Sequence, residues 1–269
     1  MAVKLKTPEQ IEGIRKSCHL SRNTLKYIRE YVQPGTTTDF LDKKIEEYIR
    51  DHGAVPATLN YRGYPRSSCI SVNDEVCHGI PGHYTLRDGD ITSVDVSTIL
   101  NGYVGDTCMM YPIGEISPEA QRLLSITEEC LDLGIRQCYP GGKIGNIGHA
   151  IGSHAKGNGY SVVYEFCGHG LGLSLHEEPE VSHIADANTG ITLRPGMTFT
   201  IEPMINQGKA RVKVDKKDKW TARTIDEKLS AQYEHAVLIT QDGVDVLTDI
   251  DGEYNGKGER VRRVSWFVV

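Results

Sequence analysis

The sequence predicts one mixed α/β domain made of two similar halves, each with two helices followed by antiparallel strands. Its 269 residues are enough for one large domain with a substantial core. Helix starts, Pro-Gly breaks, glycine helix ends and a carboxylate on an apolar strand recur in the same order, at an offset of about 107 residues. Pro-Gly after a helix is common and could recur by chance, but agreement in order, spacing and residue type favours an internal duplication. The expected halves are about 5–112 and 115–248, within a domain spanning 1–249.

The first half is expected to begin with two helices. Residues 7–32 have apolar residues near helical spacing and begin with Thr7-Pro8-Glu9-Gln10, in which an N-cap threonine and the glutamine form a capping box. Pro34-Gly35 ends this helix. A second helix, over about 37–52, ends at Gly53 as C-cap.

Strands are expected to follow. Cys69–Val72 alternates in polarity, and Val76–Pro81 is a short strand entering a loop. Ile91–Leu100 and Tyr103–Tyr111 are joined by Asn101-Gly102, the strongest two-residue hairpin signal. The sequence therefore predicts a long antiparallel pair in the first half.

The second half repeats these signals. Ser117-Pro118-Glu119 opens a helix that Pro140-Gly141 ends, and a further helix over about 144–156 ends near Gly159. The stretch 193–202 then parallels 86–95, so that the carboxylate of Glu202 corresponds to that of Asp95. Two halves packed about a pseudo-twofold axis would bring these two carboxylates together at the midline.

Composition narrows the class of protein. The net charge of −6 is spread among both signs and gives no footprint for nucleic acid. No apolar run is long enough for a membrane span, and the N-terminus has no signal-peptide core. The seven cysteines are scattered without a Cys-x-x-Cys pair, which favours reduced thiols in a cytoplasmic protein.

Four carboxylates stand on or at the ends of apolar strands. Asp95 lies within the first long strand, and Asp106 lies across the hairpin from it. Glu202 is followed by a proline that ends its strand, and Glu234 begins a strongly apolar one. Each residue alone is as well explained by a solvent-facing edge or a turn. Together they form a set of oxygen ligands, because a buried charge needs a partner or a metal.

One histidine, His169, completes this set, and a second, His176, lies close to it in the sequence. The stretch 164–181 contains His169 in Cys-Gly-His-Gly and His176 in His-Glu-Glu-Pro. Glycines around an imidazole let another group approach closely. Carboxylates with one histidine suit two divalent ions such as Mn, Fe, Co or Zn in a hydrolytic site, and no cysteine pair is placed to bind them.

The order and flanks of these residues resemble the type I methionine aminopeptidases from about residue 3 to residue 248. The segments that carry the resemblance are Cys77–Pro81, Cys167–Gly170, His176–Pro179, Pro195–Met204 and Ser230–His235. The resemblance implies the pita-bread (creatinase/aminopeptidase) fold, itself an internal duplication with a central antiparallel sheet flanked by helices. It implies removal of the N-terminal methionine from proteins with a small second residue.

The resemblance also implies a role for each residue of the set. Two divalent ions (Co, Mn, Fe, Zn or Ni) would be held by Asp95, Asp106, His169, Glu202 and Glu234. Asp106 and Glu234 would bridge the two ions. A hydroxide activated by the ions would attack the first peptide bond, and Glu202 would also shuttle the proton. A monovalent cation near Asn73, Glu75 and Ser230 is a further expectation.

Other implied residues contact the substrate. His78 would contact the nitrogen of the scissile amide and His176 the developing oxyanion, although a histidine hydrogen-bonded in a loop is the ordinary alternative. The pocket for the methionine side chain is expected to be lined by Tyr61, Tyr64, Cys69 and Trp220. The simpler explanation for these residues is ordinary packing or, for Trp220, surface exposure in a lysine-rich loop. His235 is expected to face away, and Glu177 and Glu178 to cap a loop or meet solvent.

Departures from the family pattern occur near these residues. Leu175 stands where an aromatic is expected, Leu173-Ser174 replaces a more basic or glycine-bearing pair, Val104 replaces a common histidine, and Thr58 stands near a pocket cysteine. Because none is an expected ligand, they bear on substrate preference and rate rather than on the metal site.

The resemblance implies a monomeric, cytoplasmic enzyme of the bare bacterial form, without the zinc-binding extension of eukaryotic type I enzymes. It would act on nascent chains at the ribosome. Residues 250–269 are expected to form a flexible tail. The rival hypotheses are a prolidase or aminopeptidase P, which usually carry a separate N-terminal domain, and a binding protein of the same fold that has lost catalysis.

Overall fold

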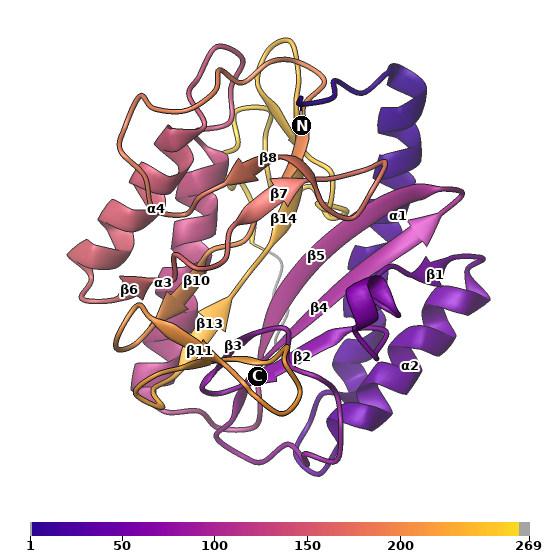
Figure 1. The fold of residues 1–269 in the computed structure, drawn as a ribbon, viewed down its shortest axis with the longest axis vertical. Helices are drawn as coiled ribbons and strands as arrows, with labels where there is room; N and C mark the ends of the chain where they lie inside the picture. Colours follow the sequence, from indigo (N-terminus) through magenta and orange to yellow (C-terminus); the bar gives the residue numbers. More distant parts are fainter. Residues whose placement is uncertain (1, 264–269) are drawn as a thin grey trace.

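The computed structural model describes residues 2–263, in which strands lie between two pairs of helices. Helices α1 (Pro8–Ile28) and α2 (Thr38–Asp51) lie on one side, and α3 (Pro118–Ile135) and α4 (Gly145–Gly157) lie on the other (Figure 1). All four helices were predicted from the sequence, with small differences at their ends. Thr7 caps α1 through a capping box with Gln10, as predicted, and the helix passes at Arg29–Tyr31 into a single 3₁₀ turn.

The strands of the first half lie in two antiparallel sheets, one of which also contains two strands from the second half. The ten residue pairs of β4 with β5 make the longest ladder, and the turn at Asn101-Gly102 has positive φ at both residues, as a type I′ hairpin requires. One sheet contains β1 (Val55–Pro56), β2 (Cys69–Val72), β4 (Ile91–Leu100) and β5 (Tyr103–Pro112). The other contains β3 (Glu75–Cys77), β11 (Val212–Val214) and β12 (Ala222–Thr224).

The other strands of the second half form two further sheets. One is five-stranded, with β7 (Gly168–Gly170), β8 (Glu177–Val181), β9 (Thr198–Ile201), β14 (His235–Ile239) and β15 (Val244–Val246). The other contains β6 (Ser161–Val162), β10 (Met204–Asn206) and β13 (Ser230–Gln232). The chain leaves one sheet after β13 and joins the other at β14, which begins next to Glu234, close to the strand start expected from the sequence.

The two halves meet at Glu234, where the chain passes from one sheet to the other. The backbone N–H of Glu234 donates to the carbonyl of Cys108 on β5 at 3.0 Å, and the hydroxyl of Thr107 donates to the Glu234 carbonyl at 2.9 Å. This contact joins the longest strand of the first half to the largest sheet of the second. It sets the midline at which carboxylates from both halves gather.

Each half buries its own apolar core between helices and strands. In the first half Leu25, Ile45 and Val94 belong to one cluster, and in the second Leu131, Ile151 and Phe199 belong to another. These side chains are at most 1% exposed. No helix within residues 2–263 is long and apolar enough to cross a bilayer.

The segment after residue 249 corrects one expectation. Within residues 250–260 several side chains contact the domain instead of forming a free tail: Glu253 is 2% exposed, and the Tyr254 hydroxyl donates to Asp132 of α3 at 2.6 Å. The packing escapes sequence reasoning because it depends on charged residues far away in the chain. Residues 264–269 of the expected tail lie outside the described residues.

Candidate metal centre

The carboxylates of the first half project from one face of the β4–β5 hairpin. Asp95 pairs with Cys108 and Ser97 pairs with Asp106, so the two acids are diagonal neighbours on adjacent strands. The Ser97 hydroxyl donates to Oδ1 of Asp106 at 2.8 Å and fixes that carboxylate. Both acids project toward the midline because alternate residues of a strand share a face.

The candidate ligands of the second half lie on or beside three neighbouring strands of the five-stranded sheet. His169 lies on β7, Glu202 follows the end of β9, and Glu234 precedes β14. The Thr200 hydroxyl receives the backbone N–H of His169 at 3.0 Å and donates to Oε1 of Glu202 at 2.7 Å. One threonine on the central strand therefore sets the relative positions of the imidazole and the carboxylate.

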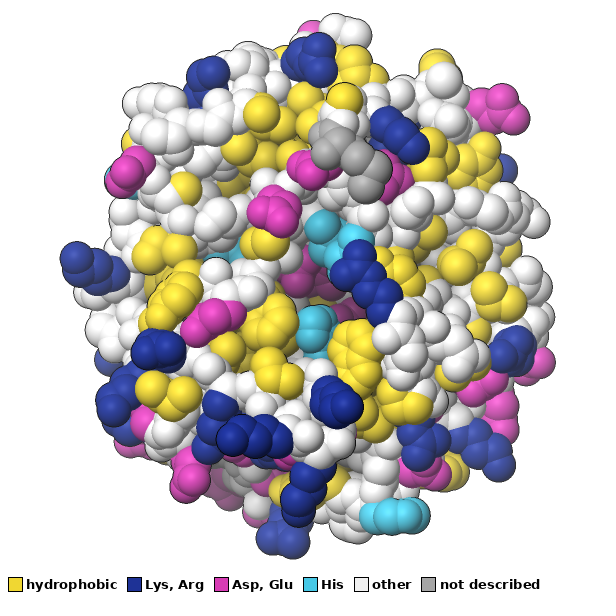
Figure 2. Space-filling view, viewed as in Figure 1, with side chains coloured by type: hydrophobic (Ala, Val, Ile, Leu, Met, Phe, Trp, Pro, Cys, Tyr) yellow, Lys and Arg dark blue, Asp and Glu magenta, His cyan; other side chains and the backbone are white. Residues whose placement is uncertain are grey.

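These groups line one cavity between the halves. The hollow is visible near the middle of the molecular face, with histidine side chains at its rim and acidic side chains inside (Figure 2). Its lining includes the sequence-predicted residues Asp95, Asp106, His169, Glu202, Glu234, His78, His176, Tyr61, Tyr64, Cys69 and Trp220. The structure thus brings all the predicted catalytic, ligand and pocket residues together.

The geometry of His169 leaves one ring nitrogen free to bind a metal. Its Nδ1 is 3.0 Å from the carbonyl oxygen of Gly170, which can only accept, so the ring proton of the neutral imidazole lies on Nδ1. Its Nε2 then carries a lone pair and lies 3.7 Å from Oδ2 of Asp106 and 3.6 Å from Oε1 of Glu202. Burial lowers the pKa of His169 to about 3 and keeps the ring neutral.

Two of the carboxylates have a buried oxygen without a hydrogen-bond partner in the described structure, and a bound cation would be such a partner. Among the described residues, Oδ1 of Asp95 and Oε1 of Glu234 are buried and accept no hydrogen bond. Candidate ligand atoms of Asp106, His169 and Glu234 all lie within 4.8 Å of one another. Unpaired oxygens beside an imidazole lone pair are the donors that divalent transition ions take, so the residues fit such ions.

Burial raises the pKa values of all four carboxyl groups, and repulsion by neighbouring carboxylates adds to it for Asp95, Glu202 and Glu234. Burial raises the pKa of Asp106 to about 7 and that of Glu202 to about 8. Burial, and then the charge of Asp106, raise the pKa values of Asp95 and Glu234 well above their usual range. Four acids in one dry cavity cannot all ionise unless positive charge joins them.

The two further histidines lie at the cavity on opposite sides. Nδ1 of His176 is 2.8 Å from the Tyr61 hydroxyl, and its ring centroid is 4.2 Å from that of His169. His78 has a positive φ of 55° and meets the rings of Phe166 and Trp220 edge-on. Burial lowers the pKa of each of these two histidines to about 4, so both rings are neutral at pH 7.

Aromatic and thiol side chains form one wall of the cavity. Trp220 is half-buried and meets Tyr64 edge-on at 5.2 Å. The Tyr64 hydroxyl donates to the carbonyls of Ser68 and Gly79, which turns its ring toward the cavity wall beside Cys69. Thr58 and Leu175, two departures from the family pattern, also line the cavity, whereas Val104 lies in the apolar cluster around Ile14.

Sequence reasoning missed several lining residues. Ser97, Met204 and Gln232 each stand two residues from a predicted carboxylate, and strand alternation alone would have placed them on the same face. Gln232 donates to Oε2 of Glu202 at 3.2 Å. His183, whose Nε2 receives the backbone N–H of Glu202 at 3.1 Å, belongs to no motif and gave no signal.

Comparison with known proteins places this fold among the creatinase/aminopeptidase, or pita-bread, proteins. The crystal structure of methionine aminopeptidase from Rickettsia prowazekii matches with a TM-score of 0.91 and 41% identity, covering 92% of this chain and 100% of that one. Prolidase from Pyrococcus furiosus shares the fold alone, with a TM-score of 0.74 and 23% identity, over 92% of this chain and 66% of that one.

Sequence comparison defines the family. Residues 12–241 match the model of metallopeptidase family M24, and the chain belongs to this family. Methionine aminopeptidase from Escherichia coli (strain K12) is 46% identical over 250 residues, which cover 92% of this chain and 94% of the relative. Methionine aminopeptidase A from Synechocystis sp. (strain ATCC 27184 / PCC 6803 / Kazusa) is 47% identical over 248 residues, covering 91% and 97%. Membership of a metallopeptidase family implies divalent metal ions.

Proposed function

We propose that this protein is a methionyl aminopeptidase that removes the N-terminal methionine from proteins with a small second residue. One observation carries the proposal: unpaired buried carboxylate oxygens lie beside a neutral imidazole in a single cavity with a pocket wall of aromatic and thiol groups. The family, and relatives named methionine aminopeptidase that match nearly the whole chain, support the same activity.

Five side chains would hold two divalent ions in the cavity: Asp95, Asp106, His169, Glu202 and Glu234. When bound, such ions lower the pKa of water and polarise a carbonyl group. The residues around the ligands keep them in place. Ser97 and Thr200 donate to Asp106 and Glu202, and the Gly170 carbonyl fixes the tautomer of His169.

Glu202 is the best-placed residue to move the proton. The residue is 9% exposed, and burial raises the pKa of its carboxyl group to about 8, close to the pH at which a cytoplasmic enzyme works. Donation from Thr200 and Gln232 holds both carboxylate oxygens in fixed positions. We assign to it the transfer of a proton from the attacking water to the leaving amine.

His176 and His78 would contact the reacting amide. Nδ1 of His176 is hydrogen-bonded to the Tyr61 hydroxyl, and in the tautomer in which that hydroxyl donates, the proton of the neutral ring lies on Nε2, where it can donate to an oxyanion. His78 lies against Phe166 and Trp220, which limits the orientations that its ring can adopt. It would donate to or accept from the nitrogen side of the scissile bond.

The methionine side chain of the substrate would pack against the cavity wall formed by Tyr64, Cys69 and Trp220. An unbranched thioether suits a pocket of aromatic edges and thiols, because sulfur packs favourably against aromatic rings. The substrate would be the N-terminal segment of a nascent protein at the ribosome. The enzyme would be a cytoplasmic monomer. The metal would be Co, Mn, Fe, Zn or Ni, with a monovalent cation near Asn73, Glu75 and Ser230.

Hydrolysis of matched peptides tests the proposal. The purified protein, loaded in turn with each metal, is given Met-Ala-Ser and Ala-Pro peptides, with and without a chelator. Release of methionine from the first peptide only, abolished by the chelator and restored by metal, is the expected result. Cleavage of the Ala-Pro peptide would favour a prolidase-like activity, and no cleavage with any metal would contradict a peptidase.

A further inference from the structure

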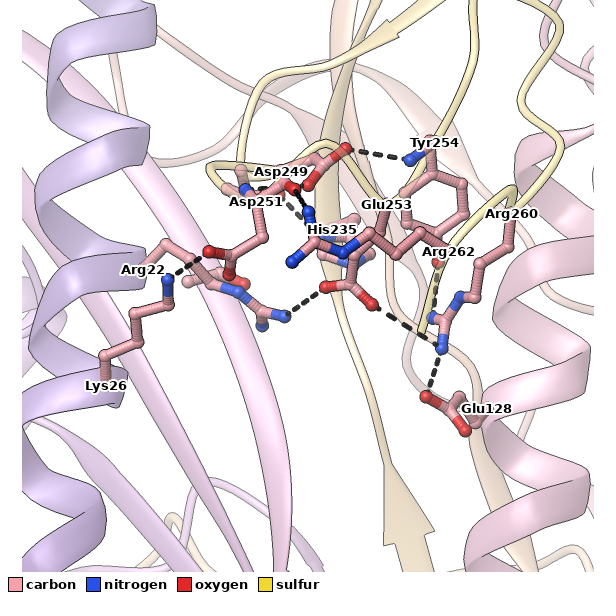
Figure 3. Close-up of polar contacts among 12 residues, drawn as sticks. Arg22, Lys26, Glu128, His235, Asp249, Asp251, Glu253, Tyr254, Arg260 and Arg262 are labelled. Atoms are coloured by element: carbon pink, nitrogen blue, oxygen red, sulfur yellow. Dashed lines mark hydrogen bonds and ion pairs between the residues drawn. The ribbon is translucent and has the colours of Figure 1, made fainter. Parts of the chain in front are cut away.

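The C-terminal strap, defined here as residues 249–262, joins the two halves behind the metal cavity. It lies outside the region matched by the family model, which ends at residue 241. Figure 3 shows its side chains reaching α1 on one side and α3 on the other. The strap folds back on itself through a bridge between Tyr254 and Arg260, and the Val261 N–H donates to the Glu253 carbonyl at 2.8 Å.

Glu253 is the central charge of this strap. Its Oε1 lies 3.6 Å from a guanidinium nitrogen of Arg22 on α1, and the two side chains are 3% and 4% exposed. Its Oε2 lies 4.0 Å from Arg260, whose other nitrogen is 3.1 Å from Asp132 on α3. Arg260 also pairs with Glu128 on α3. A chain of buried charges therefore runs from the first half to the second (Figure 3).

The same strap covers the back of the strand that presents Glu234. Next to Glu234, His235 faces away from the cavity, and its Nδ1 lies 2.7 Å from the Thr248 hydroxyl. The Tyr254 ring meets the His235 ring edge-on, with centroids 5.4 Å apart. The backbone N–H of Glu234 is therefore bonded to Cys108, and the strap packs against its neighbour His235 through the Tyr254 ring.

This arrangement matters because the ligands come from both halves. Asp95 and Asp106 belong to the first half, while His169, Glu202 and Glu234 belong to the second. A metal site binds tightly when its ligands are already at the right separation, because loose ligands must be ordered on binding. A brace between α1 and α3 fixes that separation.

We propose that the C-terminal strap is a positioning device for the metal cavity, and that Glu253 is its key positioning residue. The inference rests on the proposed metal site. Groups that hydrogen-bond a ligand directly are worth about 10- to 100-fold in metal affinity, and for a brace that acts through further contacts we expect the low end of that range.

The test is calorimetric titration of Mn²⁺ into the metal-free, full-length protein. The Glu253→Gln variant is expected to bind Mn²⁺ about tenfold more weakly than the wild type. The matched control is Thr24→Ala, which removes a buried hydroxyl of α1 whose hydrogen bond, within residues 2–263, is to the Leu20 carbonyl of the same helix. It should lower the melting temperature and leave the Mn²⁺ dissociation constant unchanged.

A second variant keeps the test decisive if Glu253→Gln does not fold. Arg22→Lys retains the charge but shortens the reach to Glu253, and at least a threefold weaker Mn²⁺ affinity is expected. A variant with a lowered melting temperature and an affinity within twofold of wild type would overturn the proposal, because the strap would then only stabilise the fold. If the wild type binds Mn²⁺ but releases no methionine, the proposed activity fails while the strap proposal stands.

Discussion

Metal affinity should rise steeply with pH, because the ligands hold protons that a cation must displace. Burial raises the pKa of Asp106 to about 7 and that of Glu202 to about 8 in the metal-free protein. Both values lie above the ordinary carboxyl range, so both groups bind protons below pH 7 and lose them as pH rises. The protonated forms cannot bind a metal, and affinity therefore increases with pH.

The two pKa values give the size of the effect. Between pH 6.5 and 8.5 the ionised fraction of Glu202 rises about 25-fold and that of Asp106 about fourfold, if each titrates with its own value. The Mn²⁺ dissociation constant should therefore fall about 100-fold, which corresponds to about 2.7 kcal/mol. The raised pKa values of Asp95 and Glu234 act in the same direction.

Calorimetry measures both the affinity and the protons. Titrations of Mn²⁺ under anaerobic conditions, in two buffers of different ionisation enthalpy, report the number of protons released per binding event. Close to two protons are expected at pH 6.5 and fewer than one at pH 8.5 from these two groups.

Variants assign the effect to its source. In Glu202→Gln only Asp106 of the pair remains, so the part of the affinity change that these two groups contribute between the two pH values should shrink from about 100-fold to about fourfold. Glu129→Gln, on the exposed surface of α3, should behave as wild type. An affinity that does not change with pH in the wild type, or no proton release at pH 6.5, would refute the reasoning.

Four further predictions follow from the site and its supports. His169→Ala should lower kcat/KM for a Met-Ala-Ser peptide at least about 100-fold and weaken Mn²⁺ binding, measured by steady-state kinetics and calorimetry. His176→Ala should lower kcat about 100-fold with Mn²⁺ affinity within twofold, because a lost oxyanion donor leaves the ligands intact; an equal loss of metal would contradict that role. Trp220→Ala should raise KM more than it lowers kcat, and the opposite split would remove it from the pocket. Gly105→Ala should lower stability by more than about 2 kcal/mol in urea unfolding, because its Cβ would lie 2.3 Å from the backbone of Cys18 on α1.

Local patterns made most of the fold predictable. The capping box at Thr7, the hairpin at Asn101-Gly102 and the apolar spacing of the helices are all short-range signals, and each leads to the element that the structure contains. The separate short strand β13 and the change of sheet near Glu234 were not visible from the sequence. The change of sheet depends on the contact between Glu234 and Cys108, which are far apart in the chain.

The site was predictable in its composition but not in its supports. Carboxylates on apolar strands and a glycine-flanked histidine are unusual enough to attract attention one by one. His183 and the charged residues of the strap give no such signal, because an arginine or glutamate in a loop is most often solvated. Their burial follows from long-range packing, in which Glu253 faces Arg22 from the other end of the chain.

Anomalous diffraction from crystals grown with Mn²⁺ tests the central claim most directly. The account predicts two manganese peaks inside the cavity, bound by oxygens of Asp95, Asp106, Glu202 and Glu234 and by Nε2 of His169. Manganese that binds only elsewhere on the protein, or a cavity without a peak at saturating Mn²⁺, would contradict it.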